Sequence, residues 1–264
     1  MNRFLSTVLV NAAAAVAAGS AFAQTPFDGD WKIDVATIDH PAKPVTYEFR
    51  GGKYECKTCA AKIQVKTDGK DQKVEGSAYI DTLAVKIIDK NNLEMTGKKG
   101  GKVVGKRKVA ISVDTNSMQV SYENTWPNGE TVKGATSYHR TAYDKTAPHL
   151  MSGSWKALKE ERVSDNGLKV SYKSEGKMLT MTKATGVSYK AEIGGADAAV
   201  TGDPGYTHVA VKAPKKNSLE ETYKRDGKTM FVTKIDTMAD GKRLRVDWID
   251  YPTRTNGNYI AVKQ

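Results

Sequence analysis

The sequence predicts an all-β protein made of two tandem up-and-down antiparallel β-barrels, lipocalin-like in architecture, with about eight strands each. Three observations lead to this prediction. Apolar and polar residues alternate in short runs, turn residues interrupt these runs every 8–12 residues or so, and a long stretch of the chain is repeated. Sequential hairpins that close into barrels leave no exposed edge strands. A pair of open sandwiches is the alternative architecture.

The first residues predict the compartment. Residues 1–23 contain one basic residue, Arg3, then an uncharged Ala-rich stretch, and end in the small-residue signal Ala21-Phe22-Ala23. This pattern is typical of a bacterial-type secretory signal peptide cleaved after Ala23. A membrane anchor is the alternative, but polar sequence follows at once. We therefore expect an exported protein, periplasmic or secreted, with no transmembrane segment after signal cleavage.

An internal repeat organises the rest of the chain. "VEGSAYIDTLAVK" at 74–86 partly matches "VTGDPGYTHVAVK" at 200–212, and "FDGDWK" at 27–32 matches "MSGSWK" at 151–156. A repeat of this length is a whole domain, because solenoid periods run at about 20–50 residues. The expected organisation is a signal peptide at 1–23, a first barrel at 24–140, a linker at 141–150 and a second barrel at 151–264.

Alternation and turn residues place the strands of both copies. In the first copy we expect strands near 29–35, 45–50, 53–56, 61–66, 79–88, 92–98, 102–114, 117–126 and 130–140. In the second copy we expect them near 153–163, 168–174, 178–183, 187–193, 206–213, 218–225, 228–239, 243–250 and 256–263.

Each copy opens with Gly-x-Trp, which places Trp31 and Trp155 at equivalent positions, and ends with a basic residue, Arg140 or Lys263. These residues resemble the opening Trp and closing Arg of the lipocalin and wider calycin group. The resemblance implies that each Trp closes one end of its own barrel under the basic residue of its last strand, Arg140 over Trp31. It also implies that the open mouth binds a small, often hydrophobic ligand. The Thr-Asp-Tyr motif of that group is missing from both copies.

One strand indicates what a barrel interior would contain. Along 118–126, alternate residues from Met118 to Trp126 share one face, and the matching residues of the second copy run from Leu244 to Asp250. An interior filled by side chains and a cavity for a small amphipathic ligand both remain open. The residues that we expect to contact such a ligand are Arg107, Tyr122, Asn124, Trp126, Tyr138, Tyr223, Trp248 and Asp250.

Arg107 is predicted to share the inward face of its strand with Val109, where the second copy has the neutral Thr233. A buried, unpaired guanidinium costs several kcal/mol, so it requires a carboxylate such as Asp81, a ligand anion or water. In that case an acidic amphipathic ligand, such as a fatty acid, would suit the first barrel. The alternative is a β-bulge near Gly105 that turns Arg107 to solvent.

The two cysteines, Cys56 and Cys59, form a Cys-x-x-Cys motif. A redox pair needs a helix N-terminus that lowers the thiol pKa, and a zinc site needs two further ligands. Neither is evident nearby, so in an exported protein we favour a local disulfide. The second copy has Thr182 and Thr185 at the same offset, which indicates that the fold does not depend on the pair.

Composition and motifs favour binding over catalysis. The net charge is +11, mostly from lysines spread along the chain, and no nucleic-acid module is recognisable. No catalytic residue, metal ligand or cofactor site is expected, although the carboxylates Asp81, Glu221 and Asp250 could share an interior. We expect an exported small-molecule binding protein. The alternative is an envelope interaction module whose Lys-rich surface holds acidic polysaccharide, lipid headgroups or a protein partner.

Overall fold

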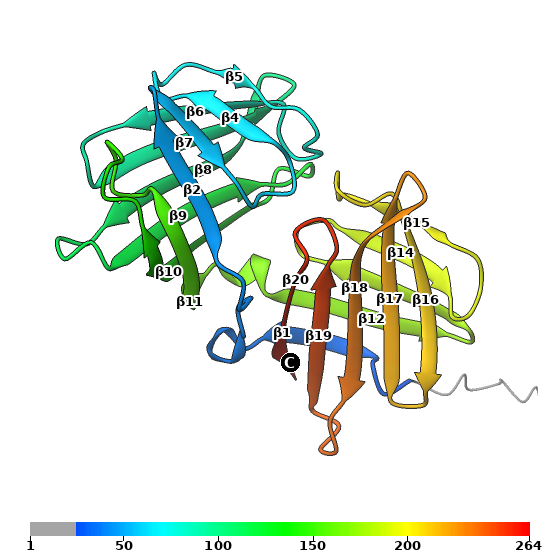
Figure 1. The fold of residues 1–264 in the computed structure, drawn as a ribbon. Helices are drawn as coiled ribbons and strands as arrows, with labels where there is room; N and C mark the ends of the chain where they lie inside the picture. Colours follow the sequence, from blue (N-terminus) through cyan, green and yellow to red (C-terminus); the bar gives the residue numbers. More distant parts are fainter. Residues whose placement is uncertain (1–24) are drawn as a thin grey trace, which may run out of the picture.

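A computed structural model describes residues 25–264, which form two ten-stranded antiparallel sheets that lie side by side (Figure 1). The expected signal peptide, its cleavage after Ala23 and the export that depends on it lie outside the described residues. Apart from two short 3₁₀ turns, Val35–Thr37 and Asp165–Gly167, the regular structure of this part is entirely β. Among residues 25–264, no helix has the length and hydrophobicity that crossing a bilayer requires. The expected all-β architecture with two barrel-like antiparallel sheets is confirmed.

One sheet closes on itself, and we call it the closed barrel. Its strands are β1 (Gly29–Ile33), β12 (Lys169–Glu175), β13 (Met178–Lys183), β14 (Ser188–Glu192), β15 (Ala198–Thr201), β16 (His208–Lys215), β17 (Ser218–Arg225), β18 (Lys228–Thr237), β19 (Arg243–Asp250) and β20 (Thr255–Lys263). Consecutive strands from β12 to β20 are hydrogen-bonded neighbours, and β1 lies between β12 and β20.

The other sheet is barrel-like, but its two end strands β4 and β5 are not paired with each other, and we call it the open sheet. Its strands are β2 (Val45–Arg50), β3 (Lys53–Cys56), β4 (Ile63–Lys66), β5 (Gln72–Lys73), β6 (Thr82–Ile87), β7 (Asn92–Lys99), β8 (Lys102–Ile111), β9 (Ser117–Thr125), β10 (Thr131–Tyr143) and β11 (Gly153–Val163). Here β11 lies between β10 and β2.

The opening strands of the two repeats are exchanged. Figure 1 shows β1, in blue, beside the red β20, while the green β11 lies beside the blue β2. Each repeat therefore supplies the strand that completes the other sheet, and the expected barrels at 24–140 and 151–264 are not contiguous units in this respect. The reason is local: β11 follows β10 directly in sequence and pairs with it, as consecutive strands usually do. The gap between β12 and β20 is then filled by β1.

Both sheets have ten strands, whereas about eight were expected and nine segments were placed in each copy. The strands that the sequence did not indicate are β5 and β15, and they have two and four residues. Segments this short contain too few alternating residues for a period of two to stand out.

The exchange also changes the partners of the two Gly-x-Trp tryptophans. Trp31 and Trp155 are both 0% exposed, and their indole N–H groups donate to the Phe27 and Met151 carbonyl oxygens at 2.7 and 2.8 Å. The guanidinium of Arg140 lies 4.0 Å from the ring centroid of Trp155, and Lys263 Nζ lies 5.3 Å from that of Trp31. The expected placement of Arg140 over Trp31 is therefore wrong, because β1 and β11 have changed sheets.

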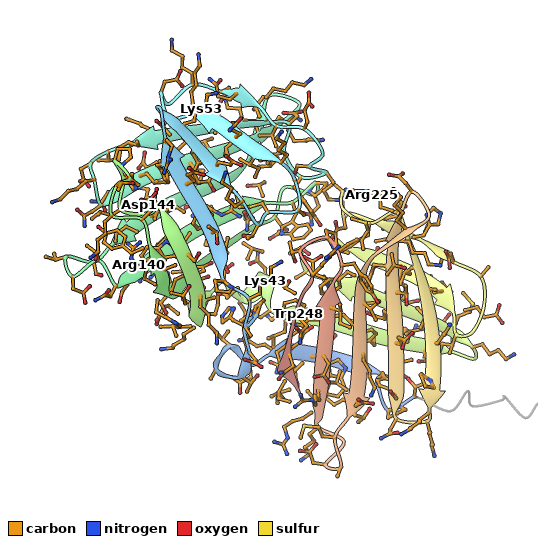
Figure 2. The ribbon with its side chains drawn as sticks, viewed as in Figure 1. Lys43, Lys53, Arg140, Asp144, Arg225 and Trp248 are labelled. Atoms are coloured by element: carbon orange, nitrogen blue, oxygen red, sulfur yellow. A yellow bond between two sulfur atoms is a disulfide. The ribbon has the colours of Figure 1, made fainter. Side chains whose placement is uncertain are left out.

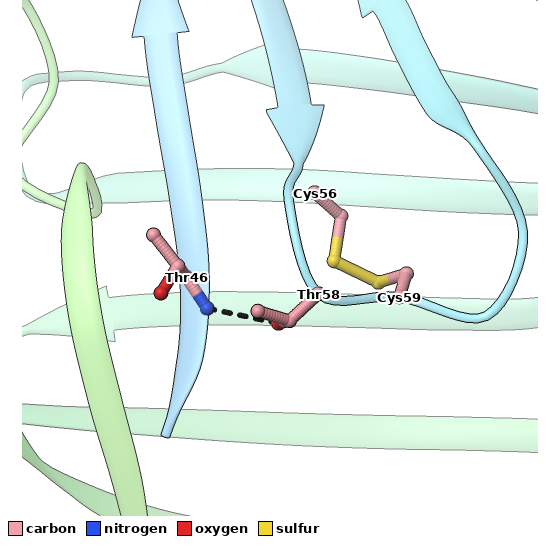
Figure 3. Close-up of a disulfide and its surroundings, with 4 residues drawn as sticks. All are labelled: Thr46, Cys56, Thr58 and Cys59. Carbon is pink, nitrogen blue, oxygen red and sulfur yellow. Dashed lines mark hydrogen bonds between the residues drawn. A yellow bond between two sulfur atoms is a disulfide. The ribbon is translucent and has the colours of Figure 1, made fainter. Parts of the chain in front are cut away.

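A disulfide joins Cys56 at the end of β3 to Cys59, as expected (Figure 3). Between them, the Thr58 hydroxyl accepts a hydrogen bond from the backbone N–H of Thr46 in β2, at 3.1 Å. Cys56 is paired across the sheet with Tyr47. The equivalent pair in the closed barrel is Met181 with Tyr172, so an apolar side chain rather than Thr182 replaces Cys56 there.

Candidate functional site

The interior of the closed barrel contains a cavity of about 300 Å³. This volume is at the lower end of the range of small-molecule sites. Most of the side chains around it come from the inward faces of β12, β17, β18, β19 and β20, and two come from the open sheet. The cavity is lined by Ile33, Tyr79, Trp126, Gly167, Leu168, Lys169, Val170, Tyr172, Lys183, Val187, Asp203, Tyr206, Glu221, Tyr223, Phe231, Thr233, Ile235, Val246, Trp248 and Tyr259.

A buried carboxylate, Glu221, lies among these side chains. It is 2% exposed and lies on the same face of β17 as Leu219 and Tyr223, which are also buried. Its Oε1 accepts hydrogen bonds from the hydroxyls of Tyr172 and Tyr189, at 3.1 and 2.5 Å.

The second oxygen of Glu221 is equally well satisfied. Its Oε2 accepts from the hydroxyls of Tyr223 and Thr233, at 2.9 and 2.8 Å. Among the described residues, the groups within hydrogen-bond distance of this carboxylate are thus four neutral hydroxyls. Burying a carboxylate is costly unless its lone pairs are filled, and four donors fill the four sites of an ionised carboxylate.

The tyrosines of this cluster remain protonated donors. Burial raises the pKa of Tyr172, Tyr189 and Tyr223 well above its usual value, and the negative charge of Glu221 raises it further. The pKa of Tyr259 is also raised, by burial first and by Glu221 second. The cluster therefore keeps its hydroxyl protons directed at Glu221 throughout the physiological pH range.

Aromatic rings form another part of the cavity lining. Phe231 of β18 and Trp248 of β19 stack with their centroids 5.8 Å apart and an interplanar angle of 19°. Tyr206 packs against Tyr223 and Phe231, at centroid distances of 5.2 and 6.1 Å. Such rings offer large apolar faces to a ligand, with polar tips at their edges.

The open sheet contributes two side chains to the cavity. Trp126 follows β9 and packs against the core of the closed barrel, and Tyr79 donates a hydrogen bond to Asp203 at 3.2 Å. The indole Nε1 of Trp126 is buried and has no hydrogen-bond partner in the described part of the chain. A buried N–H without a partner costs about 1–3 kcal/mol.

Arg107 lies in the open sheet, where its register partners are Met95 on β7 and Tyr122 on β9. A register shift opposite Gly97 and Lys98 does place a bulge near Gly105, on the side away from Arg107. The bulge therefore does not turn Arg107 to the other face of β8. Its side chain stays on the face of Val109 but is exposed to solvent. Its positive charge opposes the burial-driven rise in the pKa of Tyr54. Asp81, the expected partner, instead accepts a hydrogen bond from the Gly100 N–H at 2.7 Å.

Near Arg107, the open sheet has a buried carboxylate of its own, Glu160. It accepts hydrogen bonds from Tyr122 at 2.7 Å and from Thr136 at 2.8 Å. Gly134 makes this contact possible, because a Cβ there would lie 2.2 Å from the Tyr122 hydroxyl. Strict alternation along β11 would place Glu160 on the face opposite Trp155, and the register shift between Ala157 and Lys159 is what brings both side chains into the interior.

A separate groove of about 360 Å³ lies where the two sheets meet. Tyr138 and Trp155 of the open sheet line it together with Asp250 of the closed barrel. Lys43 crosses between the sheets here and donates to the Thr253 carbonyl oxygen at 2.8 Å; Figure 2 labels Lys43 between the two sheets and Trp248 in the closed barrel. Trp248 therefore belongs to the cavity and Asp250 to the groove, although they are neighbours on one strand face.

The structure thus divides the residues expected to contact a ligand. Trp126, Tyr223 and Trp248 line the cavity, Tyr138 and Asp250 line the groove, and Arg107, Tyr122 and Asn124 lie in the open sheet. The sequence pattern predicted Trp126 inside the first barrel, and it lies against the closed barrel instead. Tyr172, Tyr189 and Tyr206 were not singled out, although Tyr172 and Tyr189 alternate with polar residues on their strands.

Within residues 25–264, no group of three or more His, Cys, Asp and Glu side chains is arranged to hold a metal ion. No protein-family model, curated protein or solved structure matches the chain. The resemblance to the lipocalin group therefore stays a prediction, and the geometry of the cavity is what indicates a function.

Proposed function

We propose that this protein binds a small amphipathic molecule in the cavity of the closed barrel. The observation that carries the proposal is an interior of about 300 Å³ that the side chains leave unfilled, between an aromatic wall and a polar cluster. An eight- to ten-stranded barrel can be filled by its own side chains or can leave room for one ligand. Here a cavity remains next to Trp248 and Glu221.

The polar groups of the cavity favour an amphipathic ligand over a purely apolar one. Trp126 of the open sheet lines the cavity, and its buried indole N–H has no hydrogen-bond partner among the described residues. The hydroxyl cluster around Glu221 offers further polar contacts, and the stacked rings of Phe231 and Trp248 line the same cavity with their apolar faces. A few placed polar groups in a mainly aromatic pocket are typical of small-molecule sites. With the export that the N-terminal sequence predicts, we place this binding outside the cytoplasm.

A cavity-filling substitution tests the proposal. Val246 is buried in β19 and lines the cavity, so Val246→Phe should occupy part of its volume, at a stability cost of about 1–3 kcal/mol. The matched control is Val120→Phe in β9: Val120 pairs with Val109 in the open sheet as Val246 pairs with Ile235 in the closed barrel.

Binding is measured with the apolar fluorescent probe N-phenyl-1-naphthylamine and by native mass spectrometry of the freshly purified protein. We expect Val246→Phe to weaken probe binding at least tenfold and to lose any co-purified small mass, while Val120→Phe binds as the wild type does. Equal probe affinity in all three proteins would contradict a site in the closed barrel.

A further inference from the structure

All four hydroxyls that surround Glu221 donate their protons to its carboxylate. A Tyr or Thr hydroxyl has one proton and two lone pairs. Tyr172, Tyr223 and Thr233 each direct that proton to a Glu221 oxygen, and all three also line the cavity. What their oxygens present to a ligand is therefore lone pairs. These three hydroxyls can accept hydrogen bonds from a ligand and have no proton left to donate.

The same end of the cavity holds the Glu221 carboxylate, which no cationic side chain of the described residues contacts directly. The four hydrogen bonds to Glu221 all come from neutral hydroxyls of the described residues. Charged groups do occur elsewhere around the cavity, namely Lys169, Lys183 and Asp203. Of these, Lys169 is paired with Asp165, and Asp203 accepts from Tyr79. In a protein interior the attraction between opposite charges is far stronger than in water.

The rings next to the cluster also suit a cation. Phe231, Trp248 and Tyr259 line the cavity together with Glu221. The negative face of an aromatic ring attracts an ammonium group within about 6 Å of its centroid, by about 2 kcal/mol when the site is desolvated. Aromatic rings around a carboxylate thus favour an organic cation for two independent electrostatic reasons.

We infer that the ligand of the closed barrel is an organic amine, with a protonated nitrogen directed at the Glu221 cluster and an aromatic or aliphatic body along Phe231 and Trp248. This inference rests on the proposed binding function and specifies its ligand class. The ammonium donates to the hydroxyl oxygens of Tyr172, Tyr223 and Thr233 and places its charge next to Glu221.

The charge of the whole protein acts in the opposite direction. The chain has a net charge of +11, so its surface attracts anions and repels cations. At an ionic strength of 0.15 M these surface effects are screened over about 8 Å. A preference for an amine over an acid of the same shape would therefore originate in the cavity and not in the surface.

Three ligands of one shape test the inference: 4-phenylbutylamine, 4-phenylbutan-1-ol and 4-phenylbutanoate, titrated by calorimetry and by displacement of the naphthylamine probe at pH 7 and 0.15 M salt. The amine is protonated there, since alkylammonium groups titrate near pH 10.4. We expect the amine to bind at least tenfold more tightly than the alcohol, and the acid to bind most weakly.

Glu221→Gln should abolish the preference for the amine over the alcohol. The matched control is Glu220→Gln, the same change of charge on the preceding residue of β17, which lies on the other face of the strand and should keep the preference. If Glu221→Gln fails to fold, the wild-type series alone decides, because its charge selectivity needs no variant.

The possible failures are distinguishable. If none of the three ligands binds or displaces the probe, and the probe itself does not bind, the proposed function fails. If the alcohol or the acid binds as tightly as the amine, the binding function stands and the inference of a cationic ligand is overturned. A Glu221→Gln protein that folds and keeps the full preference for the amine would overturn it as well.

Discussion

Arg140 lies over Trp155 rather than over Trp31, with its guanidinium carbon 4.0 Å from the indole centroid. The three nitrogens of Arg140 donate to three carbonyl oxygens, those of Thr115, Leu150 and Ser152, at 2.6, 2.6 and 2.8 Å. At the equivalent place over Trp31, Lys263 has a single ammonium group. The two basic residues therefore occupy equivalent positions over their tryptophans, but Arg140 makes more hydrogen bonds there than Lys263 does.

Arg140→Lys should destabilise the open sheet, because an ammonium group lacks the planar fork that reaches three carbonyls while stacking on an indole. We expect a loss of about 1–3 kcal/mol in the free energy of unfolding, the usual cost of losing hydrogen bonds to a charged group. The reciprocal change, Lys263→Arg, should leave stability unchanged or raise it. Urea unfolding of both variants measures this difference. Equal losses in the two would show that the three hydrogen bonds of Arg140 contribute nothing measurable.

The exchange of opening strands predicts which fragments fold. Residues 41–164 contain β2 to β11 and hence every strand of the open sheet, so this fragment should unfold cooperatively by itself. Residues 24–150 lack β11, so β2 and β10 would each lose a partner. We expect this fragment not to unfold cooperatively. Circular dichroism during thermal unfolding compares the two. A cooperative transition in 24–150 and none in 41–164 would contradict the strand exchange.

The disulfide should contribute little to stability. Closing a loop of four residues constrains the unfolded chain by about 2 kcal/mol at most. We expect Cys56→Ser with Cys59→Ser to lower the urea midpoint modestly with an unchanged slope, and to free the turn at Thr58 that accepts from Thr46 N–H. Reduction of the wild-type protein should have the same effect. Loss of the cooperative transition in the double variant would show that the fold depends on the disulfide.

Alternation along the chain predicted most strands and the inward faces of β9 and β19, including Trp248 of β19. It could not predict the exchange, because β1 and β11 both have the Gly-x-Trp pattern and alternation does not specify which sheet each strand joins. It also could not place Trp126, since alternation specifies the face of a strand and not which neighbour the residue beyond its end will contact. The same holds for Tyr79, which is in a loop of the open sheet and reaches Asp203.

We expect His149 to give the stability of the fold a pH dependence on the acid side of neutrality. Its side chain is 1% exposed, stacks on Phe49 at 4.8 Å, and accepts from the Met151 N–H through Nδ1 at 3.1 Å. Burial lowers the pKa of His149 below its ordinary 6.5, although the Asn92 carbonyl and the negative charge of Asp89 oppose the shift.

The sign of the effect follows from proton uptake. Below about pH 6.5 the unfolded chain protonates this histidine and the folded chain does not, so acidification favours unfolding. The stabilisation is complete above that pH and is lost as the pH falls towards the lowered pKa of the folded state. The loss should approach, at most, about 1.4 kcal/mol per pH unit for one histidine.

The test is the free energy of unfolding between pH 7.5 and 5.5, measured in urea. His149→Asn keeps an acceptor for the Met151 N–H and removes the titrating ring, so we expect lower stability at pH 7.5 and a shallower dependence on pH. His208→Asn, at an exposed position, is the control and should reproduce the wild-type slope. His40, whose pKa burial also lowers, should account for part of the slope that remains. An undiminished slope in His149→Asn would mean that other groups set the acid sensitivity of the fold.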